Sequence, residues 1–223
     1  MAKVKKKKLN LKKFFGFIFT IVAIFLVYFF LSKRPIRNIV ITGTSNISDE
    51  EIMMIANLED YPSFIKTSRG KIKKNILKIP LVKDVKVHKH FFEKLVIEVT
   101  EYKVLFKIRS TDEYVLEGNK KLSDIDYVGP VLINYVQDDV LSKFVSKFEK
   151  MDNNIINKVS EIEYSPTKYD KERFILYMTD ENTVHVTLAK LKNLNNYNKI
   201  KEQLGTNKGI LYLDSGNYFE IKE

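Results

Sequence analysis

The chain has 223 residues, with 38 Lys and Arg against 28 Asp and Glu, a formal net charge of +10 and no cysteine. This length allows one or two domains. The lack of cysteine excludes disulfides, thiolate metal sites, thiol catalysis and a lipid-modified cysteine. Residues 1–13 hold seven lysines, and Lys33, Arg34 and Arg37 add three positive charges, so residues 38–223 carry 28 basic and 28 acidic side chains. The larger part of the protein is therefore neutral, which argues against a basic nucleic-acid-binding surface.

One segment is long and apolar enough to cross a membrane. Phe14–Leu31 contains no charged side chain over 18 residues. As a helix it would span roughly 27 Å, close to the ~30 Å hydrocarbon core of a bilayer. Lys12 and Lys13 precede it, Lys33 and Arg34 follow it, and such side chains reach the two interfaces with their charged ends. The sequence predicts a transmembrane helix between these anchoring flanks.

Two other structures compete with this interpretation. A cleaved signal peptide typically has an apolar region of about 7–15 residues and a small-x-small cleavage site. Here the apolar run is longer, and the Ser-Lys-Arg-Pro at residues 32–35 offers no such site. A core helix of a soluble protein would need polar residues on a solvent-exposed face, and no charged residue interrupts the run. An uncleaved anchor is the favoured interpretation.

The distribution of charge predicts how the protein lies in the membrane. Seven basic residues before the span and three after it favour a cytoplasmic arm, residues 1–13, with about 186 residues outside. The arm could also bind nucleic acid or anionic lipid, but its role as a topology signal explains it without a ligand. We expect a single-pass protein of the cell membrane with extracellular C-terminal domains.

Residues 36–101 read as strand, helix, helix, strand, strand. Ser48 followed by Glu51 is a capping box and predicts a helix start. The expected elements are a strand over 36–42, a helix with Ile52, Ile55, Ala56 and Leu58 inward, a second helix over 71–79, and alternating strands over 82–88 and 95–101.

Residues 102–223 are richer in strands and turns. Two amphipathic helices are expected, over 140–156 and 191–204, the second capped by Gly205. The expected strands cover 104–108, 113–117, 120–122, 159–164, 174–178, 183–188, 210–213 and 218–221. The fold class is α+β, with a transmembrane helix, a β-α-α-β-β domain and a mainly antiparallel β-rich domain with two helices.

No signature of an enzyme occurs in the sequence. Glycine loops for phosphates, G-x-S-x-G and H-E-x-x-H are all absent. His88 and His90 lie two residues apart and could begin a metal site with His185, but solvated strand residues are the simpler explanation. Carboxylate pairs such as Asp138-Asp139 fit a solvated face better than acid–base catalysis. We therefore assign no catalytic, cofactor-binding or metal residue and no small-molecule substrate.

The end of the chain offers a site for another kind of interaction. The strand Tyr218–Ile221 follows a tight turn, and no later strand is available to cover it. Exposed sheet edges recruit partner strands, and tyrosine and phenylalanine are favoured at interfaces. The alternative is a terminal strand that only closes its own sheet. The sequence alone leaves both open.

Five stretches carry a recognisable pattern: Ile39–Ser45, Ile79–Val87, Lys94–Glu101, Gly209–Asp214 and Tyr218-Phe219. In these stretches and in the order of its elements the chain resembles the DivIB/FtsQ family of bacterial cell division proteins, and residues 36–101 resemble its POTRA domain. Two departures from the family pattern are Thr44, where asparagine often follows the glycine, and the loop at 88–94, which lacks a proline. The Lys/Asn/Ile-rich composition is typical of a DivIB from a low-GC Gram-positive bacterium.

The resemblance implies a non-enzymatic scaffold at the division septum. Its partners would be small bitopic coiled-coil proteins of the DivIC/FtsB and FtsL types and the septal wall synthase, and it would help to control septal peptidoglycan synthesis. Residues 102–223 would form the family's β domain. Two alternatives remain: a membrane-anchored cell-wall enzyme without a recognised motif, and a POTRA-bearing secretion or assembly component. The partner-binding residues that we predict are Leu211, Tyr212, Asp214, Tyr218 and Phe219.

Overall fold

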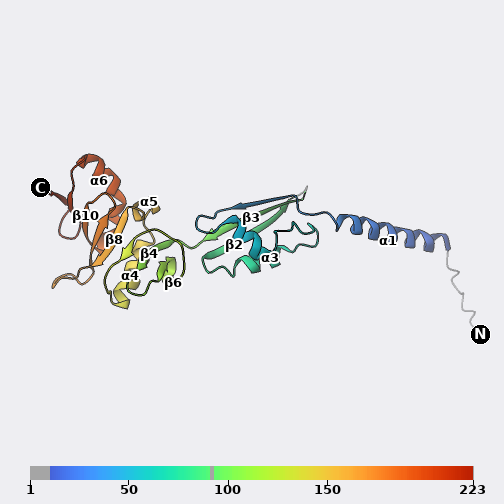
Figure 1. Cartoon of the computed structure of the whole chain (residues 1–223), viewed down its shortest axis with the longest axis horizontal. Helices are drawn as coiled ribbons and strands as arrows, with labels where there is room; N and C mark the ends of the chain where they lie inside the picture. The colour runs from blue at the N-terminus through green and yellow to red at the C-terminus, as the bar shows by residue number, and fades with distance from the viewer. Residues whose placement is uncertain (1–10, 91–92, 223) are drawn as a thin grey trace, which may run out of the picture. The chain divides into compact units, whose positions relative to one another are not determined.

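A computed structural model of the chain describes residues 11–90 and 93–222. It contains two compact units, Met1–Glu101 and Tyr102–Glu223 (Figure 1). The expected fold class is confirmed: an N-terminal apolar helix and a small α+β unit are followed by a strand-rich unit. The first ten residues of the predicted cytoplasmic arm lie outside the described residues.

The N-terminal helix α1 covers Leu11–Leu31 and has no buried residue. Its 21 residues correspond to about 31 Å, enough to cross the hydrocarbon core. It begins three residues before the predicted span, because Lys12 and Lys13 continue the helix and can still extend their charged ends to water. Among the described residues it is the one helix that is long and apolar enough to cross a membrane, as expected.

The sheet of the first unit consists of β1 (Asn38–Thr42), β3 (Lys94–Glu101) and β2 (Val82–His90), in that spatial order. β1 runs parallel to β3, and β2 runs antiparallel to it. The helices α2 (Asp49–Ala56) and α3 (Arg69–Ile76) connect β1 to β2. The largest side chains of the core are fully buried and include Ile52, Ile72, Ile76, Leu95 and Ile97.

The Ser48 half of the predicted capping box is confirmed at the start of α2. The hydroxyl of Ser48 accepts a hydrogen bond from the Glu51 backbone N–H at 3.1 Å. The second helix differs from the prediction: α3 ends at Ile76 rather than Ile79, and Leu77 is 41% exposed. A Pro at position 80 disfavours helix at the residue before it, so the chain leaves the helix in a turn.

The second unit holds one nine-stranded sheet in the order β12-β11-β10-β9-β8-β7-β4-β5-β6. Three of its eight strand pairs are parallel, so the sheet is mainly antiparallel, as expected. Its strands are β4 (Val104–Ile108), β5 (Tyr114–Leu116), β6 (Lys120–Leu122), β7 (Val131–Leu132), β8 (Val159–Tyr164), β9 (Arg173–Met178), β10 (Thr183–Thr187), β11 (Gly209–Tyr212) and β12 (Tyr218–Ile221).

One strand at the centre of this sheet was not predicted. β7 has only two residues, yet it pairs in parallel with both β4 and β8 and so joins the two halves of the sheet. Two residues are too few to show an alternating pattern, so the sequence carried no signal for this strand.

The prediction of one helix over 140–156 was wrong. The chain forms α4 (Asp138–Phe148) and a short α5 (Asn153–Ile156) with a break between them. The ammonium group of Lys103 donates to the carbonyls of Glu149 at 3.1 Å and Met151 at 2.6 Å. These carbonyls lie at the break, so a contact with a distant residue, rather than a local glycine or proline, accompanies the end of the helix.

The predicted helix over 191–204 also differs in form. A 3₁₀ segment, η2 (Leu188–Asn196), leads into α6 (Tyr197–Leu204), and a short 3₁₀ turn, η1 (Glu117–Asn119), precedes β6. Asparagine competes locally with helical hydrogen bonds, which explains the shorter α-helix after Asn193, Asn195 and Asn196. Gly205 ends α6 at a φ of 62°, as the sequence predicted.

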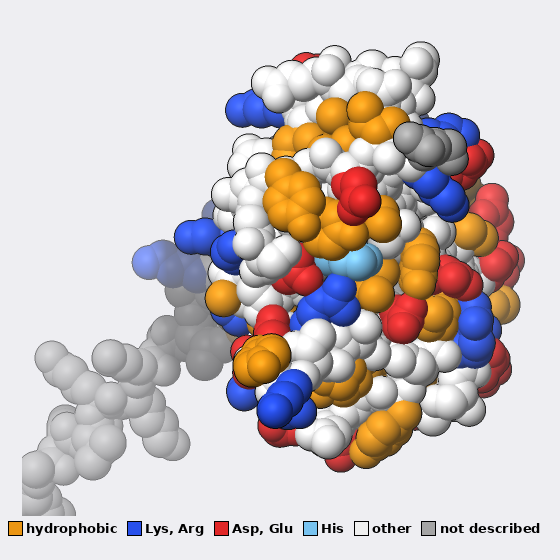
Figure 2. Space-filling model, turned by 90° about the vertical axis from the view of Figure 1, so that its left-hand side faces the viewer, with side chains coloured by type: hydrophobic (Ala, Val, Ile, Leu, Met, Phe, Trp, Pro, Cys, Tyr) orange, Lys and Arg blue, Asp and Glu red, His pale blue; other side chains and the backbone are white. Residues whose placement is uncertain are grey.

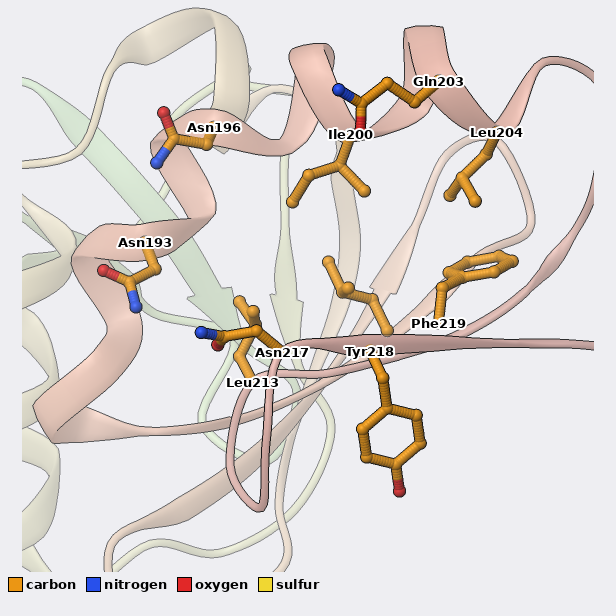
Figure 3. A pocket seen from close by; sticks show the side chains of 10 residues that line it. Asn193, Asn196, Ile200, Gln203, Leu204, Leu213, Asn217, Tyr218 and Phe219 are labelled. Atoms are coloured by element: carbon orange, nitrogen blue, oxygen red, sulfur yellow. The ribbon is translucent and has the colours of Figure 1, made fainter.

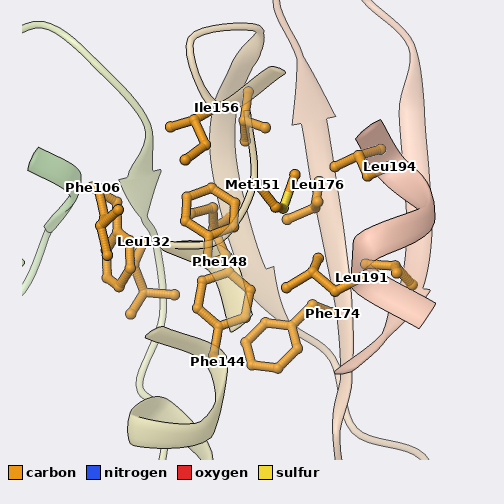
Figure 4. Close-up of a cluster of buried hydrophobic side chains, with 14 of the residues drawn as sticks. Phe106, Leu132, Phe144, Phe148, Met151, Ile156, Phe174, Leu176, Leu191 and Leu194 are labelled. Carbon is orange, nitrogen blue, oxygen red and sulfur yellow. The ribbon is translucent and has the colours of Figure 1, made fainter. Parts of the chain in front are cut away.

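Aromatic rings form the centre of the second unit's core (Figure 4). Phe144 of α4 stacks on Phe148 with 5.0 Å between ring centroids and on Phe174 of β9 with 4.5 Å. These contacts hold α4 against the sheet. β12 lies at one end of the strand order, away from these rings in the sequence of strands.

Candidate partner-binding edge

β12 is an edge strand, as the sequence suggested. It pairs antiparallel with β11, and within the described residues no strand pairs with its other side. Lys222 donates its backbone N–H to the carbonyl of Lys208 at 2.9 Å. Since hydrogen-bonded and non-bonded pairs alternate along an antiparallel ladder, the backbone groups of Phe219 and Ile221 point away from β11. The edge therefore offers unpaired donors and acceptors to another strand.

A ladder of aromatic rings crosses one face of the sheet at this edge. His185, Tyr212 and Tyr218 lie side by side on β10, β11 and β12. The Tyr212 and Tyr218 rings are stacked 4.7 Å apart, and His185 meets Tyr212 edge-on at 4.8 Å. Tyr218 is 52% exposed. Figure 2 shows a face of the molecule on which hydrophobic side chains gather around a histidine, with acidic and basic side chains beside them.

A half-buried arginine connects this ladder to the turn before β12. Arg173 Nε donates to Asp214 Oδ2 at 2.7 Å, and Nη1 donates to the Ser165 carbonyl and hydroxyl at 3.2 and 3.0 Å. Its Nη2 lies 2.8 Å from His185 Nδ1. Since the guanidinium can only donate, Nδ1 is the acceptor and the proton of a neutral His185 sits on Nε2.

The same contacts perturb the two titratable groups. Burial, and then the positive charge of Arg173, lower the pKa of His185, so the ring is neutral at pH 7. Burial alone would raise the pKa of Asp214, but hydrogen bonds from Arg173 and Ser215 outweigh it and lower the pKa. The cluster is thus a charged pair beside a neutral imidazole, which suits a structural role in holding the turn.

The other face of β12 lies over a groove. Phe219 packs against the core, and Figure 3 shows it on the α6 side of the strand, with Tyr218 pointing the opposite way. The groove has a volume of about 530 Å³. Ile200 and Leu204 of α6 contribute apolar side chains, and four amides contribute polar ones: Asn193, Asn196, Gln203 and Asn217.

The structure separates the five residues that were predicted to bind a partner. Tyr212 and Tyr218 share the aromatic ladder, and Phe219 lies on the opposite face. Leu211 is only 3% exposed and belongs to the core, and the Asp214 carboxylate points into the arginine cluster. A binding role for all five stays a prediction.

Sequence reasoning missed Arg173 as part of this site. A single arginine at the start of an apolar strand was the only signal, and its partners lie 8 to 41 residues away. His88 and His90 lie in the first unit with 6.4 Å between ring centroids, whereas His185 belongs to the second. At the membrane flank, the Lys33 ammonium lies 4.3 Å from the centre of the Phe29 ring.

Comparison with known proteins relates both units to one family. Residues 34–102 match the model of the FtsQ-type POTRA domain. The chain is 30% identical to the cell division protein DivIB of Bacillus subtilis (strain 168), over 97% of this chain and 86% of that protein. It is 29% identical to DivIB of Listeria monocytogenes, over 99% of this chain and 85% of that protein.

A solved structure is also similar. It is the major extracytoplasmic domain of DivIB from Geobacillus stearothermophilus, in its trans isomer, with 22% identity and a TM-score of 0.40, covering 47% of this chain and 95% of that one. The sequence similarity to the Bacillus subtilis protein runs through the apolar helix, the POTRA match and the strand-rich unit alike. The chain therefore belongs to the DivIB family of cell division proteins.

Proposed function

We propose that this protein is a non-enzymatic scaffold of the division complex, with its N-terminus in the cytoplasm and residues 32–223 outside the membrane. The observation that carries the proposal is the β12 edge, with outward backbone groups at Phe219 and Ile221 and the exposed ring of Tyr218. A site of this kind binds a polypeptide rather than a small substrate.

The mechanism is the addition of a partner strand to β12. Successive residues of an added strand face opposite sides of the sheet. One set would lie beside the Tyr212–Tyr218 ladder, and the other beside Phe219 and the α6 groove. Main-chain hydrogen bonds would supply affinity, and the two faces would supply specificity.

The family supplies the candidates for the partner. We propose small bitopic proteins of the DivIC/FtsB and FtsL types, which would bring the scaffold close to the septal wall synthase and so affect peptidoglycan synthesis. A fluorescent fusion should then concentrate at midcell in dividing cells. A uniform signal around the envelope would contradict this part of the proposal.

A proline substitution tests strand addition at the edge. Ile221→Pro removes an outward N–H without removing a β11–β12 hydrogen bond, and Ile221→Ala keeps that N–H while also losing the isoleucine side chain. One lost hydrogen bond costs about 0.5–1.5 kcal/mol, so the Pro variant should bind a purified DivIC-type partner roughly 2- to 13-fold more weakly than the Ala variant. Equal affinities of the two folded variants would contradict strand addition.

A tyrosine pair tests the exposed face. Tyr218→Ala should weaken binding, because exposed aromatic residues at an interface contribute much of its affinity. Tyr169→Ala is the matched control, since Tyr169 lies in the same unit and is 93% exposed. The reverse result, weaker binding only for the control, would place the partner elsewhere on this unit.

A further inference from the structure

A loop of the first unit is fastened to the chain where it leaves α1. The hydroxyl of Ser63 donates to the carbonyl of Ser32 at 2.6 Å, and the N–H of Phe64 donates to the carbonyl of Arg34 at 2.9 Å. The N–H of Ile36 in turn donates to the carbonyl of Pro62 at 3.0 Å. No free linker therefore separates this loop from the end of the membrane helix.

These bonds determine the depth of the loop. Leu31 is the last residue of α1, and the 21-residue helix matches the hydrocarbon core, so Ser32 lies at the boundary with the headgroups. The headgroup layer is about 5–8 Å thick on each side. Ser63 is bonded directly to Ser32, and Ile65 is at most about 7 Å of chain further on. The loop thus lies at headgroup depth whatever the tilt of the helix.

The loop presents the apolar side chains that such a position favours. Tyr61 is 47% exposed and Ile65 is 42% exposed, while Phe64 between them is half-buried. Tyrosine is enriched at membrane–water interfaces because its ring is apolar and its hydroxyl is polar. If the loop faced only water, the exposed apolar surface of these side chains would contribute no favourable free energy.

Cations follow the loop on its α3 side. Lys66 and Arg69 are exposed, and neither takes part in an ion pair within the described part of the chain. The ammonium of Lys89 donates to the Phe64 carbonyl and lies 4.8 Å from the centre of the Phe64 ring. Burial and the positive charge of Arg69 lower the pKa of Lys89, which places the charges of Lys89 and Arg69 near one another.

The junction itself adds further positive charge. Arg34 and Arg37 share one carboxylate, Glu93, at 3.4 and 2.7 Å, and their own side chains are 63% and 73% exposed. One carboxylate cannot neutralise two guanidinium groups. Acidic Glu59 and Asp60 precede Tyr61 on the α2 side of the loop, whereas Lys66 and Arg69 follow Ile65 on its α3 side.

We propose that the loop Tyr61–Lys66, with Arg69, docks on the headgroup layer of anionic phospholipids beside α1. Tyr61 and Ile65 enter the upper part of the lipid layer, and the cations bind lipid phosphates. Such a contact limits how the first unit tilts on its membrane helix. It does not depend on the partner-binding edge of the second unit.

The cysteine-free chain allows a direct test of the apolar contact. The full chain carrying Ile65→Cys, labelled with the environment-sensitive dye NBD, is placed in nanodiscs containing phosphatidylglycerol. Leu77→Cys is the matched control, because Leu77 is 41% exposed but lies beside the end of the sheet where β2 begins. At position 65 we expect blue-shifted emission and quenching by doxyl-labelled lipid, with neither at position 77. No quenching at 65, or equal quenching at both positions, would overturn the proposal.

A charge pair tests the phosphate contact. Lys66→Gln/Arg69→Gln should reduce the quenching at position 65, whereas Lys74→Gln/Lys78→Gln removes the same charge further along α3 and its turn and should not. The quenching should also weaken when phosphatidylcholine replaces phosphatidylglycerol. Because the nanodisc contains no division partner, a loop that serves a protein partner would stay unquenched and refute lipid docking. Quenching that is unaffected by either charge or lipid type would overturn the role of the cations.

Discussion

Replacing Arg173 by methionine should destabilise the edge of the second unit. The substitution keeps an apolar side chain of similar length and removes the guanidinium that binds Asp214, Ser165 and His185. The side chains of Arg173 and Asp214 are only 15% and 12% exposed, so water cannot readily replace the lost partner. The turn that leads into β12 would then be held less firmly.

The structure gives the size of this effect. Breaking a buried ion pair by removing one partner costs about 3–5 kcal/mol. Asp214 keeps hydrogen bonds from the Ser215 N–H at 2.7 Å and hydroxyl at 3.2 Å, so we expect a loss near the lower limit, about 3 kcal/mol. Asp214→Asn retains an acceptor and should cost about 1–2 kcal/mol. The double variant leaves no unpaired charge and should lose about 1–3 kcal/mol less than the sum of the two.

Native-state hydrogen exchange of the full chain in nanodiscs measures these free energies locally. Amides of β9, β10 and β11 should exchange faster in Arg173→Met. In the double-mutant cycle, the double variant should lose less stability than the sum of the two single losses. A loss below about 1 kcal/mol, or a coupling of zero, would refute the reasoning, because it would mean that the Arg173–Asp214 pair behaves as an exposed one.

Three further predictions use the same measurement. Gly43→Ala should lower the free energy of unfolding by about 3 kcal/mol or more, since φ is +84° and the new Cβ would lie 2.1 Å from a β3 carbonyl oxygen. Gly118→Ala, at φ +72° in open space, should lower it by about 1 kcal/mol. Equal losses in the two variants would contradict this reasoning. Lys103→Met should cost about 1–3 kcal/mol and speed exchange between α4 and α5, and unchanged exchange there would show that the break does not need this contact. The folded-state pKa of His185 is lower than 6.5, so the unfolded chain binds the proton more readily. Stability should therefore fall as the pH drops from about 6.5 towards the folded-state pKa. His185→Gln should remove this part of the pH dependence of stability, and an unaltered pH dependence would assign it to other groups.

The candidate site could be predicted in part because strand position follows from local signals. The tight turn before Tyr218–Ile221 suggested a strand at the edge of its sheet, and within the described residues β12 is an edge strand. The sequence predicted the exposure of the site residues only in part: Tyr218 of β12 is exposed, but Leu211 of β11 pairs opposite Phe219 and is buried in the core. The anchoring arginine could not be predicted, because no short-range pattern connects Arg173 with Asp214.

The membrane helix, the capped helix after Ser48 and the order of strands and helices are determined by the sequence itself. Hydropathy, caps and periodicity act over a few neighbouring residues, so they can be recognised without knowing the fold. Tertiary structure alone decided that β7 joins the two halves of the sheet, that the helix after Asp138 breaks beside Lys103, and that Ser63 binds the end of α1. Each of these depends on groups brought together from distant parts of the chain, where the free energy comes from packing and pairing rather than from local preference.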